Sequence, residues 1–183
     1  MTTIYLIRHA EAEGNLYRIA HGHYNSCITD DRGCRQIRAL AERFRDVPVD
    51  AVYASDLIRT RTTAQSIYLP KGLQLHPDPA FREICMGEWE EHCWYELLRK
   101  YPQSHYDFNH RLDRWQVPGS ETARQVLDRF GKEQCIPTGL QHGTVTVKYG
   151  GKLYETTTFR TEGSYSDGRH PDSVAFVPDV KED

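Results

Sequence analysis

The sequence predicts an α/β domain with a mostly parallel sheet, and two observations lead to that fold class. Residues 4–7 form a short unbroken apolar run, typical of a strand buried on both faces, and residues 51–54 form a second one. Each run leads into polar residues and then into apolar residues at helical spacing. Because strands that alternate with helices usually pair in parallel, we expect both strands in one sheet.

Length and composition bound the type of protein. The 183 residues fit one domain, and 23 basic against 26 acidic residues give a net charge of −3, which predicts neither a nucleic-acid nor a membrane partner. The five cysteines are odd in number and form no Cys-x-x-Cys pair, which favours reduced thiols. No leader and no apolar run of about 18 residues is visible. These features predict a soluble, cytoplasmic protein.

The first half of the chain alternates loops, helices and strands. Residues 10–30 are predicted as a loop, and Thr29 or Asp30 as the N-cap of an amphipathic helix that ends near Asp46. His21 and His23 lie in that loop. Their alternate spacing could suggest a metal pair, but no cluster completes four ligands, so we expect a solvated loop and no metal.

The later elements are predicted by the same signals. Ser55 and Asp56 can cap a helix over residues 57–67, and Ser120 can cap another. The remaining predictions are a strand at residues 72–76, a helix at 94–101 that Pro102 stops, and a hairpin at 144–155 with a Gly-Gly turn. We expect one catalytic domain over residues 1–160, followed by an irregular tail at 161–183 with a short strand at 173–177.

Chemically active residues directly follow the first strand. Arg8 and His9 stand where ligands bind in open α/β sheets, at the carboxyl end of a strand. The stretch from Arg8 to Asn15 resembles the Arg-His-Gly signature of the histidine phosphatase superfamily, the phosphoglycerate mutase-like proteins, with Ala10 where most members have Gly. The resemblance implies that His9 is the nucleophile and that Arg8 and Asn15 contact the phosphate. Neutral imidazole suits that role near pH 7.

Two further motifs follow in the family's chain order. Ser55 to Ala64 reads Ser-x-Leu-x-Arg-x-x-x-Thr-Ala and resembles the second family motif, which implies that Arg59 clamps the phosphate. The stretch from Glu83 to Glu90 resembles the Glu-x-x-x-Gly-x-Trp-Glu segment, which implies that Glu83 is the general acid.

The resemblance implies a three-layer αβα sandwich of the phosphoglycerate mutase-like fold. It also implies hydrolysis of a small phosphorylated metabolite through a phosphohistidine at His9, with no cofactor. We prefer a phosphatase to a mutase because residues 91–95 replace an Arg-His-Tyr-Gly stretch typical of the mutases. The alternatives are mutase-type phosphoryl transfer and a catalytically silent module that binds a phosphorylated ligand.

The resemblance fails after Phe130. The family continues with a buried strand that runs into a Ser-His-Gly motif, whereas residues 131–143 hold no strand of four or more apolar residues. The hairpin at 144–155 resembles the family's closing strands. Either the chain has lost a central strand, or the recorded sequence omits one. His142 imitates the missing second His and is a candidate for contacting the substrate. A chain without that strand should fold poorly or exchange strands in a homodimer.

Overall fold

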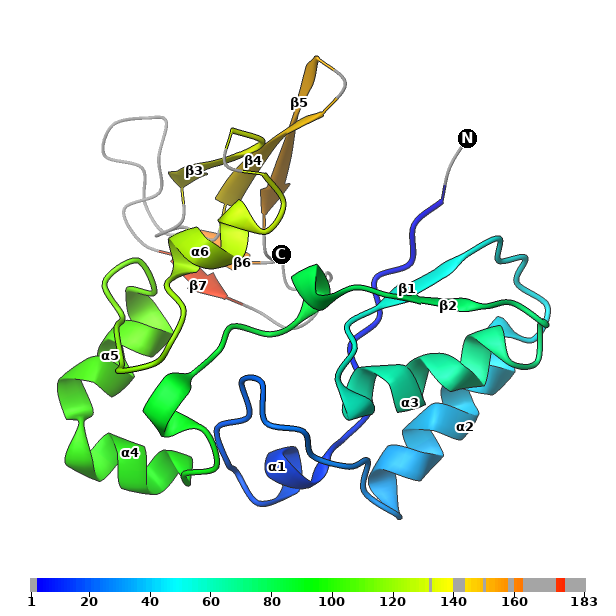
Figure 1. The fold of residues 1–183 in the computed structure, drawn as a ribbon, viewed down its shortest axis with the longest axis horizontal. Coiled ribbons are helices and arrows are strands. Elements are labelled where there is room, and N and C mark those ends of the chain that lie inside the picture. Colours follow the sequence, from blue (N-terminus) through cyan, green and yellow to red (C-terminus); the bar gives the residue numbers. More distant parts are fainter. Residues whose placement is uncertain are drawn as a thin grey trace. The chain divides into compact units, whose positions relative to one another are not determined.

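A computed structural model describes residues 3–131, 133–139, 144–149, 151–157, 160–162 and 174–176 (Figure 1). The chain divides into two compact units. The first comprises Met1–His105 with Gln116–Glu121, and the second comprises Tyr106–Trp115 with Thr122–Asp183. Every predicted site residue belongs to the first unit except His142, which lies outside the described residues.

A strand-helix-strand element forms the centre of the first unit. Strand β1 (Val52–Ala54) pairs in parallel with β2 (Leu75–Pro77), and Val52 lies opposite Leu75. Helix α3 (Ile58–Tyr68) connects the two strands, and α2 (Arg32–Phe44) lies beside α3 (Figure 1). The strands predicted at residues 51–54 and 72–76 are both present, although the second begins three residues later than expected. The expected partner of residues 51–54 was residues 4–7, whereas the observed partner is β2.

The predicted first strand is wrong. Residues 4–7 form no strand, and the Ile4 and Leu6 side chains are 77% and 93% exposed. Tyr5 keeps one apolar contact, an edge-to-face packing on Phe44 of α2 with ring centroids 5.2 Å apart. A strand buried on both faces needs neighbours that pair its backbone groups, and no strand in the described part of the chain pairs with this run. The apolar run therefore stays exposed.

The predicted helix caps are only partly confirmed. Asp31 is the N-cap of α2, whereas the Thr29 hydroxyl accepts the Gly33 N–H within the first turn, at 2.9 Å. At the start of α3, the side-chain oxygen of Asn25 accepts the Ile58 N–H at 2.7 Å. Ser55 and Asp56 do not cap that helix, because the N-cap position is Leu57. The loop that contains Asn25 is thereby bonded to the helix that carries Arg59.

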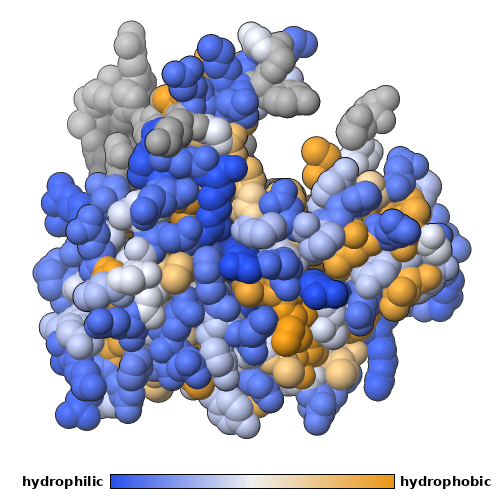
Figure 2. Space-filling view, in the orientation of Figure 1, coloured by the Kyte–Doolittle hydropathy of each residue, from blue (hydrophilic) through white to orange (hydrophobic). Residues whose placement is uncertain are grey.

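Short elements complete the first unit. They are α1 (Glu13–Leu16), the 3₁₀ turns η1 (Pro79–Phe81) and η2 (Gly87–Trp89), α4 (Trp94–Lys100) and the start of α5 (Pro102–His110). Pro102 ends α4 as predicted, and it also occupies the first position of α5, where a missing N–H costs nothing. Figure 2 shows apolar residues among polar ones on the face over α2, α3 and β1.

The second unit contains α6 (Ala123–Asp128) and two small antiparallel sheets. Thr122, not Ser120, caps α6 through a capping box with Gln125, while the Ser120 hydroxyl accepts the Val117 N–H. The first sheet has the order β3 (Cys135–Gly139), β4 (Thr144–Tyr149), β5 (Lys152–Thr157), so the hairpin prediction is confirmed. The second pairs β6 (Arg160–Glu162) with β7 (Val174–Phe176), which confirms the short strand predicted in the tail.

Strand β3 was not predicted, because Cys135–Gly139 is not an apolar run and contains Pro137. It pairs antiparallel with β4, with an irregular register between Ile136 and Gly139, so it does not replace the parallel central strand expected after Phe130. Among the helices that the structure describes, none combines the length and apolar character needed to cross a membrane.

Candidate functional site

The peptide of Ala10 orients His9. The ring Nδ1 of His9 lies 2.7 Å from the Ala10 carbonyl oxygen, and a carbonyl can only accept, so Nδ1 carries the proton. In the neutral ring, Nε2 is then left with a lone pair. The Ala10 N–H donates to the Thr63 hydroxyl at 3.0 Å, and that hydroxyl donates to the Arg59 carbonyl at 2.8 Å. Helix α3 thus holds the backbone of Ala10 through buried hydrogen bonds, and the Ala10 carbonyl in turn contacts the imidazole.

Arg59 occupies a buried place on α3 and is only 2% exposed. Its two terminal nitrogens donate to the carbonyls of Tyr24 and Gly22, at 2.8 and 2.9 Å. Its Nε is buried with no hydrogen-bond partner among the described residues. Since a guanidinium has five N–H donors, two bonds to the loop leave donors for an anion.

Electrostatics links His9 to both arginines. Burial lowers the pKa of His9; the Ala10 carbonyl raises it, and the positive charges of Arg59 and Arg8 lower it further. The unperturbed pKa of His is about 6.5, so a lowered pKa leaves the His9 ring mostly neutral near pH 7. Arg8 itself is exposed. Three of the predicted residues therefore lie close enough to act on one another.

His21 also belongs to this cluster, contrary to the prediction of a solvated loop. Its ring stacks on that of His9 with centroids 6.4 Å apart and planes at 26°. Burial lowers the pKa of His21, as do the charges of Arg59 and Arg8, while Glu83 raises it. No local sequence signal identifies His21: its ring packs so closely on Gly14 that a Cβ there would collide with it, and this contact exists only in the folded loop.

Glu83 reaches the cluster from the segment that follows η1. Its negative charge raises the pKa of both His21 and Arg59, so the electrostatic influence of Glu83 extends to the cluster. Its carboxylate accepts the Ile84 N–H at 2.9 Å. The preceding residue, Arg82, makes a two-point ion pair with Asp56 just after β1, with Nε 2.6 Å from one carboxylate oxygen. This pair fixes the segment next to the sheet.

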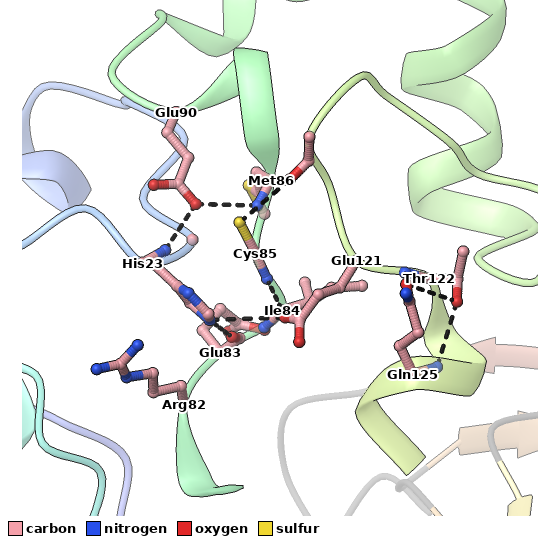
Figure 3. Close-up of polar contacts among 12 residues, drawn as sticks. His23, Arg82, Glu83, Ile84, Cys85, Met86, Glu90, Glu121, Thr122 and Gln125 are labelled. Carbon is pink, nitrogen blue, oxygen red and sulfur yellow. Dashed lines mark hydrogen bonds and ion pairs between the residues drawn. The ribbon is translucent and has the colours of Figure 1, made fainter. Parts of the chain in front are cut away.

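His23 joins the same segment, so the solvated-loop prediction is wrong for it as well. Its ring Nε2 lies 2.9 Å from the Glu83 carbonyl oxygen (Figure 3). Its backbone N–H donates to a Glu90 carboxylate oxygen at 2.7 Å, and that oxygen also accepts the Met86 N–H at 3.0 Å. Within the described residues, no group of three or more His, Cys, Asp or Glu side chains could hold a metal ion.

The remaining predicted residues are not placed at the cluster. The side-chain oxygen of Asn15 accepts the Ala12 N–H at 2.9 Å, a local bond at the start of α1. Its contact with substrate stays a prediction, as does that of His142. A separate hollow of about 530 Å³, lined by Glu11 and Asp30 among others, contains none of the four predicted catalytic residues.

Comparison with known proteins decides the family. The family described as "Histidine phosphatase superfamily (branch 1)" matches residues 4–133. The chain belongs to this superfamily. Solved structures with the same fold include Bacillus stearothermophilus YhfR, with a TM-score of 0.62 and 25% identity over 67% of this chain and 60% of that one. The α/β fold class of the phosphoglycerate mutase-like proteins is thereby confirmed.

Two further structural relatives are named as phosphatases. The alpha-ribazole phosphatase from Shigella flexneri has a TM-score of 0.60 and 26% identity, over 68% of this chain and 62% of its own. A mycobacterial glucosyl-3-phosphoglycerate phosphatase has a TM-score of 0.61 at 22% identity, over 66% and 59% of the two chains, and supports the fold alone. This chain spans about 60% of the length of these structures.

The end of the chain resembles a second family. The family described as "Poly A polymerase head domain" matches residues 97–183. Curated relatives named CCA-adding enzyme are 58% identical in Lactobacillus delbrueckii subsp. bulgaricus and 47% in Oceanobacillus iheyensis, each over 67 residues. Those matches cover 37% of this chain and 16% of each enzyme.

This second match corrects one interpretation. We attributed the hairpin at residues 144–155 to the closing strands of the phosphatase family, but that family's match ends at residue 133. The hairpin lies only within the second match. The point after Phe130 where the resemblance fails thus lies close to residue 133, where the match to the histidine phosphatase family ends.

Proposed function

We propose that this chain is a phosphomonoester hydrolase that acts through a phosphohistidine at His9. The observation that carries the proposal is the orientation of His9: the Ala10 carbonyl takes the Nδ1 proton, so the Nε2 lone pair is available for attack. A depressed pKa supports this role, because it keeps the ring neutral at pH 7. Membership of the histidine phosphatase superfamily supports it independently.

The reaction has two steps. Nε2 of His9 attacks phosphorus, the bond from phosphorus to the ester oxygen breaks, and Glu83 gives its proton to the departing alkoxide. Water then attacks the phosphohistidine, the P–N bond breaks, Glu83 takes a proton from the water and inorganic phosphate leaves. Arg59 and Arg8 balance the charge on the phosphoryl oxygens throughout. Asn15 is proposed to contact the substrate phosphate.

The proposed substrate is a small phosphorylated metabolite. Structural relatives named as phosphatases support hydrolysis over mutase-type transfer. The proposal includes no cofactor, because the two arginines supply the positive charge. The alternative is a silent module, in which Arg59 helps to bind a phosphorylated ligand that the protein does not hydrolyse.

A steady-state assay tests this function. The full chain should hydrolyse p-nitrophenyl phosphate, and His9→Ala should lose at least about a hundredfold in kcat, since nucleophile and acid-base contributions are of that size. His76→Ala, a change of an exposed histidine on β2, is the matched control and should keep full activity. Equal rates for His9→Ala and the wild type would overturn the proposal. Phosphate binding without turnover would favour the silent module.

A second candidate function concerns the second unit. We propose that residues 122–183 represent part of a nucleotidyltransferase head and bind a nucleoside triphosphate, because this region lies in the second family match. The sheet β3-β4-β5 belongs to that region. Equilibrium binding of labelled CTP and ATP to the full chain tests this, and an absence of binding at millimolar nucleotide would refute it.

A further inference from the structure

We propose that His23 is a positioning residue for Glu83 and that Glu121 holds the His23 ring in place. The inference rests on the proposed function, because it assigns His23 a role only if Glu83 is the general acid. It concerns how an exposed carboxyl is kept at the position where it must deliver a proton.

Glu83 needs such support. Its side chain is exposed, although its charge acts on His21 and Arg59. A general acid must come within about 2.6–3.2 Å of the leaving oxygen, so small movements of its backbone cost rate. The backbone of Glu83 is the part that His23 contacts.

The His23 ring makes a directed bond. Its Nε2 lies 2.9 Å from the Glu83 carbonyl oxygen, and because a carbonyl can only accept, Nε2 must carry a proton (Figure 3). A carboxylate oxygen of Glu121 lies 3.6 Å from the same nitrogen. The two side chains are 27% and 26% exposed, so both are partly shielded from water.

Glu121 is itself held firmly. The same carboxylate oxygen accepts the Cys85 N–H at 2.8 Å, and the Glu121 N–H donates to the Cys85 carbonyl at 3.0 Å. A β-bridge between Met86 and Ser120 continues this pairing. The Glu121 carboxylate is thus tied to the segment that follows Glu83, and it faces the His23 ring from a fixed backbone.

The backbone of His23 is held from the other side. Its N–H bonds to Glu90, and the carbonyls on either side of it, those of Gly22 and Tyr24, accept from Arg59. One short loop therefore contacts the proposed phosphate clamp through its backbone and the proposed general acid through its ring. His23 links the position of Glu83 to the position of Arg59.

The dependence of rate on the leaving group tests the inference. Glu83→Gln is the reference: it should slow hydrolysis of an alkyl phosphate such as glycerol 2-phosphate much more than that of p-nitrophenyl phosphate, because a nitrophenolate leaves without a proton. His23→Ala in the full chain should show the same selectivity in weaker form. We expect about a fivefold to tenfold loss of kcat on the alkyl ester, in line with one lost hydrogen bond, and less than about twofold on the aryl ester.

Rescue distinguishes positioning from general stability. His23→Gln keeps an N–H donor and should restore most of the alkyl-ester rate. Glu121→Gln keeps an acceptor for Cys85 but loses the charge, and about a twofold to threefold loss on the alkyl ester alone is expected. This variant serves as the test if His23→Ala does not fold, as judged by its melting curve.

The positioning role of His23 and the general-acid role of Glu83 can be refuted separately. Equal losses on both esters in folded His23→Ala, while Glu83→Gln remains selective, would overturn the positioning role and leave the proposed function standing. A Glu83→Gln variant with equal losses on both esters would overturn the general-acid step, and the inference about His23 with it.

Discussion

Replacing Thr63 with valine tests the hydrogen-bond chain that orients His9. The Thr63 hydroxyl accepts the Ala10 N–H at 3.0 Å and donates to the Arg59 carbonyl at 2.8 Å. Thr63 and Ala10 are only 4% and 5% exposed, so water cannot replace the lost partner. Valine has nearly the same shape but no hydroxyl, and Thr63→Val therefore leaves a buried N–H without an acceptor.

The expected loss of stability comes from the Ala10 N–H that Thr63→Val leaves without an acceptor. An unsatisfied buried donor costs about 1–3 kcal/mol, and in a chain of this size each kcal/mol lowers Tm by about 2–4 °C. We therefore expect Thr63→Val to melt about 2–12 °C lower than the wild type. Because Ala10 also holds the His9 ring through its carbonyl, kcat/KM for p-nitrophenyl phosphate should fall as well, by about tenfold.

The assay combines thermal unfolding, followed by circular dichroism, with initial rates well below Tm. Thr62→Val is the matched control, since Thr62 is the neighbouring residue on α3 and is half-buried. An unchanged Tm would refute the buried hydrogen bond. A lowered Tm with an unchanged rate would show that the Ala10 peptide does not orient the nucleophile.

Two further predictions concern charge. Arg8 lowers the pKa of His9, so Arg8→Gln should raise it; an NMR titration of the His9 ring measures this, with Arg61→Gln as the control, and an unchanged titration would contradict the cluster. The bond from Arg82 lowers the pKa of Asp56, so the stability that their ion pair contributes is present above the unfolded pKa of about 3.9 and is lost as pH falls through the lower folded value. Because both side chains are about one-third exposed, Asp56→Asn should cost less than about 1 kcal/mol in urea unfolding at pH 7 and a smaller amount at pH 2, and an equal cost at both pH values would contradict the assignment.

The sequence predicts correctly those elements whose signals lie within one short stretch of the chain. Residues 51–67 carry the signals of both a strand and a helix in a short span, and the structure has β1 and α3 there. Arg8, His9, Arg59 and Glu83 match family motifs. In the structure, the charges of Arg8 and Arg59 act on the pKa of His9, and that of Glu83 acts on the pKa of Arg59.

Features that depend on distant partners could not be predicted from local pattern. Residues 4–7 read as a buried strand, but burial requires a neighbouring strand that the described residues do not supply. His21 and His23 read as loop residues, because their partners Gly14, Ser26 and Glu83 are recognisable only once the loop is folded. The capping role of Asn25 was missed for the same reason, since it caps a helix 33 residues away.

Trapping of the covalent intermediate tests the central claim most directly. The full chain is mixed briefly with a labelled phosphomonoester, quenched, and mapped by mass spectrometry under conditions that preserve base-stable, acid-labile phosphate. We predict label on His9 alone and none in His9→Ala. Label that persists in His9→Ala, or label on another residue of the wild type, would contradict the assignment of His9 as the nucleophile.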